Sequence, residues 1–164
     1  MSSCVQTKTT TLVLIMDEAQ RRILLGMKKR GFGAGWWNGF GGKVQPDETV
    51  EECAKRETLE ECGLVVTSMH QIGRMSFEFV DDPVLLDVHV FYCDAYTGNV
   101  AESEEMLPRW FAYDDVPYTE MWPDDVLWYP YLLKKQKFKA NFLFQGHTEI
   151  LKHTVEVVQG FDET

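Results

Sequence analysis

Three glutamates are spaced so that they fall on one side of a helix. Glu57, Glu60 and Glu61 lie within segment 56–61, and at about 100° per residue they project within about 100° of one another. Like charges at this spacing destabilise an isolated helix by about 0.2–0.5 kcal/mol per pair. A hard divalent cation with oxygen ligands compensates for that repulsion, so the cluster predicts a metal site. The alternative interpretation is a solvated acidic helix, because glutamate-rich helices are common.

Two nearby side chains could support the same chemistry. Glu48 would add a fourth carboxylate, and Arg56 would place a compensating guanidinium beside the cluster. The chain carries 16 Lys and Arg against 26 Asp and Glu, a net charge of −10, which argues against binding to a nucleic-acid backbone. A phosphate substrate remains compatible with this charge if divalent cations lie between the two sets of oxygens.

A helix over 49–62 is predicted to position the glutamates. Thr49 and Glu52 fit a capping box, and Gly63 stands where a left-handed residue ends a helix. A second helix is expected to start near Pro123 and Asp124 and to run to about residue 136, with a disturbance at Pro130.

Strands are expected around these helices. Residues 11–16 and 23–28 read as strands about a turn at 17–21, and apolar residues alternate around 75–79 and 86–92. Closing strands are predicted at 140–145 and 149–158, and the glycine-rich stretch 31–42 reads as a loop. These elements predict a single domain over 1–164 of the α+β class, an α/β/α sandwich in which two helices flank a mixed sheet.

Composition limits the setting of the protein. The longest early apolar run, 12–16, is too short for a membrane span or a secretory signal. The four cysteines, Cys4, Cys53, Cys62 and Cys93, form no C-x-x-C pair, so free thiols are expected. We expect a soluble, intracellular monomer that binds neither membranes nor nucleic-acid polymers. Its expected location is the cytoplasm, with the mitochondrial matrix and nucleus as further compartments.

The spacing around the glutamates closely resembles the Nudix box. Gly42, five residues, Glu48, seven residues, Arg56-Glu57 and then segment 60–64 follow that pattern over residues 42–64. One departure is Thr58, where the pattern has a bulky aliphatic residue, and we expect an altered core contact there. The resemblance implies a mixed sheet between helices, with the box as loop–helix–loop. It also implies hydrolysis of a nucleoside diphosphate linked to another group.

Site roles follow from that resemblance. It implies that Glu57, Glu60 and Glu61 ligate metal, that Glu61 is the first candidate for deprotonating the attacking water, and that Arg56 orients Glu57. The backbone of Gly42 would let the loop approach the metals and phosphates. The implied cofactor is Mg²⁺, with Mn²⁺ as a substitute. Cations bridging carboxylate and phosphate oxygens would neutralise the triphosphate, so that water can attack and pyrophosphate can leave.

Further stretches resemble the animal branch of this superfamily that acts on oxidised purine nucleoside triphosphates. They are 28–43, 77–79, 86–89, 102–106 and 121–125, and the likeness extends from about residue 11 to 158. It implies conversion of 8-oxo-dGTP and 2-hydroxy-dATP, with O6-methyl-dGTP as a further candidate, to monophosphate and pyrophosphate. Such an enzyme would prevent incorporation of damaged nucleotides into DNA.

Four residues in those stretches suit recognition of a purine. Trp122 offers a large aromatic face, and Asn38 carries both a donor and an acceptor. The adjacent acids Asp124 and Asp125 should not both ionise in a desolvated pocket. A protonated acid donates to a base carbonyl and an ionised one accepts from a base N–H, so the pair could serve oxidised guanine and oxidised adenine. Taken singly, the four would instead be a core tryptophan, a turn asparagine and acids at a helix N-terminus.

The remaining candidates rest mainly on the resemblance. Possible substrate contacts are Thr11, Lys28, Phe32, Phe77 and Phe79, with Lys43 as a second phosphate contact. Glu105 corresponds to an additional glutamate of the catalytic metal site outside the box. Ordinary alternatives are surface lysines, core aromatics and an acidic loop.

Two other functions remain open from the sequence. One is Nudix hydrolysis of another nucleoside diphosphate derivative, such as a dinucleoside polyphosphate or ADP-ribose. The other is a non-catalytic nucleotide- or protein-binding module on the same fold.

Overall fold

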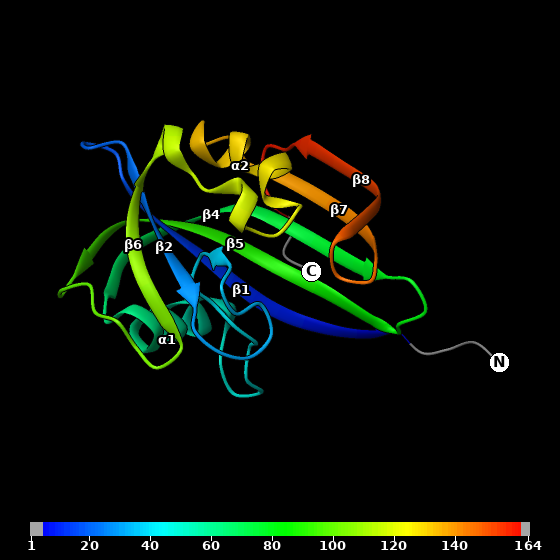
Figure 1. Cartoon of the computed structure of the whole chain (residues 1–164), viewed down its shortest axis with the longest axis horizontal. Helices are drawn as coiled ribbons and strands as arrows, with labels where there is room; N and C mark the ends of the chain where they lie inside the picture. The colour runs from blue at the N-terminus through cyan, green and yellow to red at the C-terminus, as the bar shows by residue number, and fades with distance from the viewer. Residues whose placement is uncertain (1–4, 162–164) are drawn as a thin grey trace.

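Alternating apolar residues build an eight-stranded mixed sheet (Figure 1). The computed structural model describes residues 5–161. The strands are β1 (Gln6–Asp17), β2 (Arg22–Lys28), β3 (Trp37–Asn38), β4 (Val65–Phe79), β5 (Val84–Thr97), β6 (Met106–Ala112), β7 (Phe138–Gln145) and β8 (Glu149–Val157). Their order is β3-β2-β1-β5-β4-β7-β8, with β6 paired to β2. The β1–β5 and β4–β7 pairs are parallel, so the sheet is mixed as predicted.

Two α-helices cover opposite faces of this sheet (Figure 1). They are α1 (Val50–Cys62) and α2 (Asp125–Leu133), and two short 3₁₀ helices, η1 (Tyr113–Asp115) and η2 (Tyr118–Glu120), precede α2. Successive β1 side chains point to opposite faces. Val13 therefore packs in the same cluster as Ala54 of α1, whereas Leu14 packs in the same cluster as Trp128 of α2. The predicted α/β/α sandwich is confirmed.

The ends of α1 follow the predicted signals. Thr49 Oγ1 accepts a hydrogen bond from the Glu52 backbone N–H at 3.1 Å, and the Glu52 carboxylate accepts one from the Thr49 N–H at 2.9 Å. Gly63 closes the helix in the left-handed region at φ 80°. Thr58 is fully buried and its hydroxyl donates to the Ala54 carbonyl at 2.8 Å. The altered core contact expected there is therefore a satisfied polar one.

Several predicted boundaries were wrong. Helix α2 ends at Leu133 rather than near residue 136, because Lys135 adopts a left-handed φ of 57° that a helix cannot continue through. Strand β1 begins at Gln6 rather than Thr11, since parallel pairing with β5 supports its polar start. Strands β3 and β6 were not predicted; each is held by pairing with β2 rather than by its own pattern.

Two general expectations concern cysteines and membranes. Cys53, Cys62 and Cys93 are free as predicted, and all three are buried; Cys4 lies outside the described residues. Neither α-helix within 5–161 has the length and apolar character needed to span a bilayer.

Candidate active site

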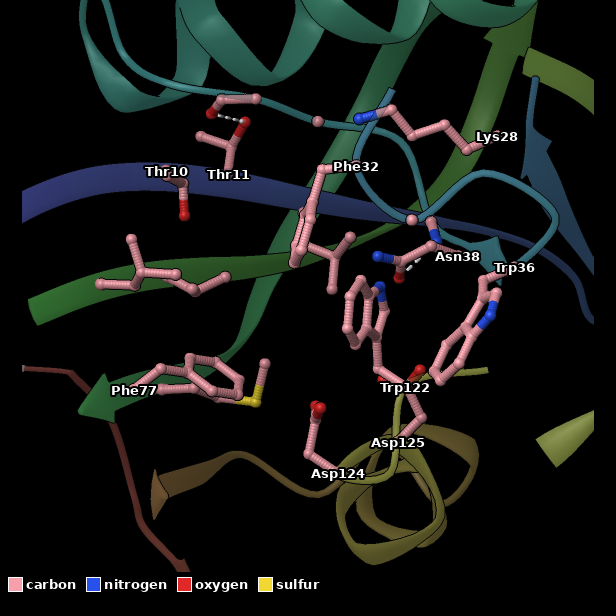
Figure 2. Close-up of a pocket in the computed structure, with 18 of the residues that line it drawn as sticks. Thr10, Thr11, Lys28, Phe32, Trp36, Asn38, Phe77, Trp122, Asp124 and Asp125 are labelled. Carbon is pink, nitrogen blue, oxygen red and sulfur yellow. Dashed lines mark hydrogen bonds between the residues drawn. The ribbon is translucent and has the colours of Figure 1, made fainter. Parts of the chain in front are cut away.

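A pocket of about 330 Å³ lies where β1, the glycine-rich loop, β4, β5 and the start of α2 meet (Figure 2). That volume is typical of a small-ligand site. Most residues that the sequence nominated for substrate contact line it. They are Thr11, Lys28, Phe32, Asn38, Phe77, Phe79, Trp122, Asp124 and Asp125, together with Gly42 and Glu61 of the box. Residues far apart in the chain thus converge on one cavity.

Aromatic rings form one wall of the pocket. The Trp122 ring lies 5.1 Å from the Phe32 ring at an interplanar angle of 28°, and 4.7 Å from the Trp36 ring at 47°. Figure 2 shows Trp122 between these two side chains. Gly33 has a φ of 88°, and a Cβ there would lie 3.1 Å from the indole, so glycine lets the loop pack closely on Trp122. The wall presents flat apolar faces suited to a heteroaromatic base.

The two adjacent acids lie at the buried end of the pocket. Asp124 is 6% exposed and Asp125 is 2% exposed. The Trp128 indole N–H donates to Asp124 Oδ2 at 2.9 Å, and the Asp124 side chain makes no cap hydrogen bond to the helix. Burial raises the pKa of both carboxyls, and the neighbouring charge of Asp124 raises that of Asp125 further. The pair therefore retains a proton when ordinary carboxyls have lost theirs. Both acids do lie at the N-terminus of α2, as the alternative interpretation had it, but the Asp124 side chain does not cap the helix.

Asn38 and Lys28 come from the paired strands β3 and β2. The Asn38 side-chain oxygen accepts a hydrogen bond from the Gly39 N–H at 2.8 Å, which orients its amide group in the pocket lining. Lys28 lies at the end of β2, and its charge opposes the rise in the pKa of Glu61. An amide group and a cation near the box glutamate Glu61 therefore share the cavity.

The loop before α1 presses against the box carboxylates. The Gly41 N–H donates to Glu61 Oε1 at 2.8 Å. Burial raises the pKa of Glu61 to about 8, against the stabilising Gly41 hydrogen bond and with a contribution from the charge of Glu57. A Cβ at Gly42 would lie 2.6 Å from Glu57 Oε1, and one at Gly41 would lie 1.9 Å from the Thr11 carbonyl oxygen. Position 41 therefore requires glycine, whereas a side chain at position 42 would displace the Glu57 carboxylate.

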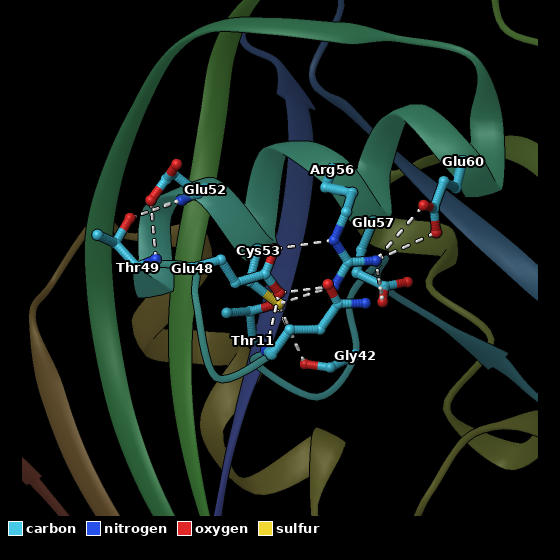
Figure 3. A network of polar contacts seen from close by, with 10 residues as sticks. Thr11, Gly42, Glu48, Thr49, Glu52, Cys53, Arg56, Glu57 and Glu60 are labelled. Atoms are coloured by element: carbon cyan, nitrogen blue, oxygen red, sulfur yellow. Dashed lines mark hydrogen bonds and ion pairs between the residues drawn. The ribbon is translucent and has the colours of Figure 1, made fainter.

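Arg56 ties the remaining acids of α1 together (Figure 3). Its Nε and Nη2 donate to the two Glu48 carboxylate oxygens at 2.9 and 2.7 Å, and its Nη1 donates to Glu57 Oε1 at 3.0 Å. Nη1 also lies 3.3 Å from Glu60 Oε2. Arg56 lowers the pKa of Glu48 to about 2. The prediction that Arg56 orients Glu57 agrees with this geometry, whereas Glu48 is an arginine partner rather than a free fourth carboxylate.

The predicted metal ligands are not gathered into one ready-made centre. Among the described residues, no group of three or more His, Cys, Asp or Glu side chains is arranged to hold an ion. Glu60 is 57% exposed and pairs with Arg56, and Glu105 pairs with Arg30 at 2.7 Å. Their expected convergence with Glu57 and Glu61 is therefore not observed, because arginines attract both side chains.

Two carboxylates nevertheless suit a divalent cation. Burial raises the pKa of both Glu57 and Glu61, and Glu57 fills the space that the missing Cβ of Gly42 leaves open. Desolvated carboxylates beside an accessible backbone loop are stabilised by a hard cation. These residues fit such an ion, with oxygen ligands supplied by side chains and the loop.

A family model described as the NUDIX domain matches residues 6–132, most of the chain. The chain belongs to the Nudix family. Members of that family generally use divalent metals. The family and the fold predicted from the box are confirmed.

Curated relatives match nearly the whole Nudix chain. An oxidized purine nucleoside triphosphate hydrolase from Danio rerio is 53% identical over 152 residues, which cover 93% of this chain and 96% of the relative. A protein of the same name from Mus musculus is 54% identical over 151 residues, or 92% of this chain and 96% of the relative.

Solved structures agree on the fold. A mutator MutT protein from Bacillus halodurans superimposes with a TM-score of 0.81 at 24% identity, covering 91% of this chain and 97% of that one. A MutT Nudix hydrolase from Burkholderia pseudomallei gives 0.62 at 28% identity, covering 68% and 88%.

Several residues that line the pocket were not predicted from the sequence as substrate contacts. They include Thr10, Leu12, Trp36, Met75, Leu86, Val88, Met106, Phe144 and His147. Trp36 lies four residues after Phe32 in the same glycine-rich stretch, so its aromatic side chain could have marked it as a pocket residue from the sequence. His147 lies in the β7–β8 turn and gave no local signal, because only the sheet order brings that turn to the pocket, where its ring lies 4.9 Å from Phe32.

Proposed function

We propose that this Nudix chain hydrolyses oxidised purine nucleoside triphosphates to the monophosphate and pyrophosphate, and so removes damaged nucleotides before a polymerase can use them. The observation that carries the proposal is one pocket that joins an aromatic wall and a buried acid pair to Glu61 and Gly42 of the box. The names of the relatives from fish and mouse support the same substrate class.

At one end, the pocket contacts both the flat face and the polar edge of the purine base. The Trp122 ring provides the stacking surface, and the Asn38 amide donates or accepts at the base edge. Asp124 and Asp125 share a proton, so the pair offers one donor and one acceptor. An oxidised guanine and an oxidised adenine differ in which base atoms carry hydrogen, and a proton that moves between the acids serves both.

At the phosphate end, the box residues orient water and bind charge. Glu57 and Glu61, with the Gly42 backbone, would hold the divalent ion, Mg²⁺ or in its place Mn²⁺; Glu60 and Glu105 would join them by leaving their arginines. When bound, the ion neutralises the phosphates and lowers the pKa of water. Arg56 keeps the Glu57 carboxylate turned toward Gly42. With the ion bound, Glu61 would be ionised, and, held at Oε1 by Gly41, it would take the proton of the attacking water at Oε2. Lys28 would attract the phosphates.

Base selection by the acid pair predicts a pH effect. Because the two acids share a proton, the ratio of kcat/KM for 8-oxo-dGTP to that for 2-hydroxy-dATP should change with pH in the wild type. The variant Asp124→Asn fixes one partner as neutral and should flatten this change. Identical pH profiles for both bases in the wild type would contradict shared-proton recognition.

Product analysis tests the proposed reaction. Purified protein is incubated with 8-oxo-dGTP, dGTP or ADP-ribose, each with Mg²⁺ or with chelator, and the products are separated by ion-exchange chromatography. We expect Mg²⁺-dependent pyrophosphate release that is fastest with 8-oxo-dGTP. Preferential cleavage of ADP-ribose would assign a different Nudix substrate, and tight nucleotide binding without cleavage would indicate a non-catalytic module.

The proposed function also implies which partners the enzyme has, that it is a monomer and where it is located. Its partners are free nucleotides rather than nucleic-acid polymers or membranes, in keeping with the net charge of −10. We place it as a monomer in the cytoplasm, with the mitochondrial matrix and nucleus as further compartments. Sedimentation velocity and cell fractionation test these assignments.

A further inference from the structure

Two buried polar side-chain atoms, one in the acid pair and one a helical turn away on α2, have no hydrogen-bond partner among the protein atoms of residues 5–161. They are Asp125 Oδ2 and the hydroxyl of Tyr129. Leaving one such group unpaired in a protein interior is costly, and buried polar atoms are therefore nearly always satisfied. Two orphans on neighbouring turns of one helix suggest that one enclosed water molecule bridges them.

The register of α2 supports this pairing. Asp124 and Trp128 are four residues apart, and the Trp128 N–H donates to Asp124 Oδ2 at 2.9 Å. Asp125 and Tyr129 have the same spacing one residue further along, so they share a helix face in the same way. Each acid of the pair therefore has an aromatic residue with a polar hydrogen one turn below it.

We propose that Tyr129 is the positioning residue for Asp125, with its hydroxyl bonded to Asp125 Oδ2 through one enclosed water molecule. The inference rests on the proposed function, because it assigns Tyr129 a part in selecting the base. Tyr129 is fully buried and does not line the pocket, so it acts on substrate only through Asp125.

The titratable groups around Asp125 are few. Asp124 adjoins it on α2, and Tyr118 of η2 packs edge-on against Tyr129 with ring centroids 5.7 Å apart. Burial raises the pKa of both tyrosines and the Asp125 charge raises each further, so the two phenols stay protonated at neutral pH. A protonated phenol that donates to Asp125 favours its ionised form and leaves the shared proton more often on Asp124.

The direct test reads the carboxyls in protein without substrate. Carbon-13 NMR of aspartate-labelled protein follows the titration of Asp124 and Asp125, with Asp125→Asn used to assign the signals. Removing the hydroxyl in Tyr129→Phe should raise the Asp125 midpoint by about half to one pH unit, the effect of losing one hydrogen bond to a carboxylate. Introducing 3-fluorotyrosine at position 129 provides a stronger donor and should lower the midpoint.

The matched control is Tyr118→Phe, which removes the neighbouring hydroxyl and should leave the midpoint of Asp125 within about 0.2 pH units. Thermal unfolding gives a second measurement, since loss of a real hydrogen bond in Tyr129→Phe should lower Tm by about 2–4 °C. An unmoved or lowered midpoint in Tyr129→Phe, or a Tm that rises because the hydroxyl was an orphan, would overturn the proposal.

Kinetics then connects the positioning residue to substrate choice. In Tyr129→Phe the pH at which the preference between 8-oxo-dGTP and 2-hydroxy-dATP changes should rise by the same amount as the Asp125 midpoint. A midpoint that moves while the preference does not would overturn the role in base selection. The NMR titration needs no activity, so failure of the proposed function and failure of the Tyr129 contact are seen separately.

Discussion

Glu61 is a weaker acid than an ordinary glutamate because it is buried against the box loop. It is a residue of ordinary type, yet burial beside Gly41 and near Glu57 raises its pKa to about 8. Gly42 matters for a different reason, since the space of its missing side chain is filled by Glu57. At the scale of single residues, the site therefore depends on desolvated carboxylates and on backbone without side chains.

The raised pKa of Glu61 predicts how stability varies with pH in metal-free protein. Between the ordinary value of 4.5 and about 8, the folded state keeps a proton that the unfolded chain has released, so stability falls as pH rises through this window. At about 1.4 kcal/mol per pH unit, the difference across this window should be on the order of 5 kcal/mol. In Glu61→Gln this part of the slope should vanish, as measured by urea unfolding in chelator. A slope unchanged by the substitution would contradict the assignment.

Activity of the same variant separates function from stability. Glu61→Gln keeps the shape of the side chain but cannot accept a proton, so kcat with 8-oxo-dGTP and Mg²⁺ should fall by about 10² or more. Its KM should change less. Wild-type turnover in the variant would remove Glu61 from the reaction.

Gly42→Ala should impair catalysis more than folding. Its Cβ would meet the movable end of Glu57 at 2.6 Å, so the carboxylate shifts and kcat/KM should fall by about tenfold or more, with a small change in Tm. Gly160→Ala is the matched control, because a Cβ there meets nothing within 4 Å. Gly41→Ala should instead reduce the yield of folded protein, since its Cβ meets backbone. Equal effects at positions 42 and 160, by kinetics and calorimetry, would argue against this account.

At the element scale, α1 fixes the positions of the box acids because both of its ends are held in place. The capping box fixes its first turn, the left-handed Gly63 fixes its last, and Arg56 bonds to acids on and before the helix. Thr58 turns its hydroxyl back to Ala54, which lets a polar side chain occupy a core position. The helix can therefore be weakened at its end without touching the catalytic groups.

Thr49→Ala removes the cap and should lower stability by about 1 kcal/mol, or about 2–4 °C in Tm. Activity per folded molecule should be retained, because no pocket residue is altered. Glu52→Gln keeps an acceptor for the Thr49 N–H and should behave like the wild type. Differential scanning calorimetry checks both variants, and an unaffected Thr49→Ala would mean that the cap contributes nothing.

At the scale of the whole molecule, the pocket exists only when the sheet is complete. Its lining comes from β1, the glycine-rich loop, β4, β5, the start of α2 and the β7–β8 turn. A ligand in it therefore binds the folded state and not the unfolded chain. Opposing elements are joined by aromatic contacts such as those of Phe32 with Trp122 and with His147.

Binding of the product 8-oxo-dGMP should consequently raise Tm. At a concentration of about 100 times Kd the gain is about 2.7 kcal/mol, or about 5–10 °C for a chain of this size. Unmodified dGMP at the same concentration should give a smaller shift, and Trp122→Ala should lose the response. Equal shifts with both nucleotides would contradict recognition of the oxidised base.

Local patterns predicted the parts that depend on neighbours in sequence. Helix α1, its caps and the strands around 23–28 and 149–158 follow from periodicity and end signals. Strands β3 and β6 escaped because pairing with β2 decides them, and α2 ended early through a backbone torsion at Lys135 that no composition encodes. Nomination of Trp122, Asn38, Asp124 and Asp125 needed the resemblance, since each has a more ordinary interpretation alone.

The sequence by itself determined the chemistry of the box, because helical geometry turns a spacing of three and four residues into a shared face. Only the tertiary structure decided which carboxyls keep a proton and which are ionised and paired with arginine. Burial raises the pKa of Glu61 and of the Asp124–Asp125 pair, whereas Glu48 and Glu105 are paired with arginines. Desolvation and long-range pairing depend on the three-dimensional surroundings of each side chain, and these are set by segments distant in the chain.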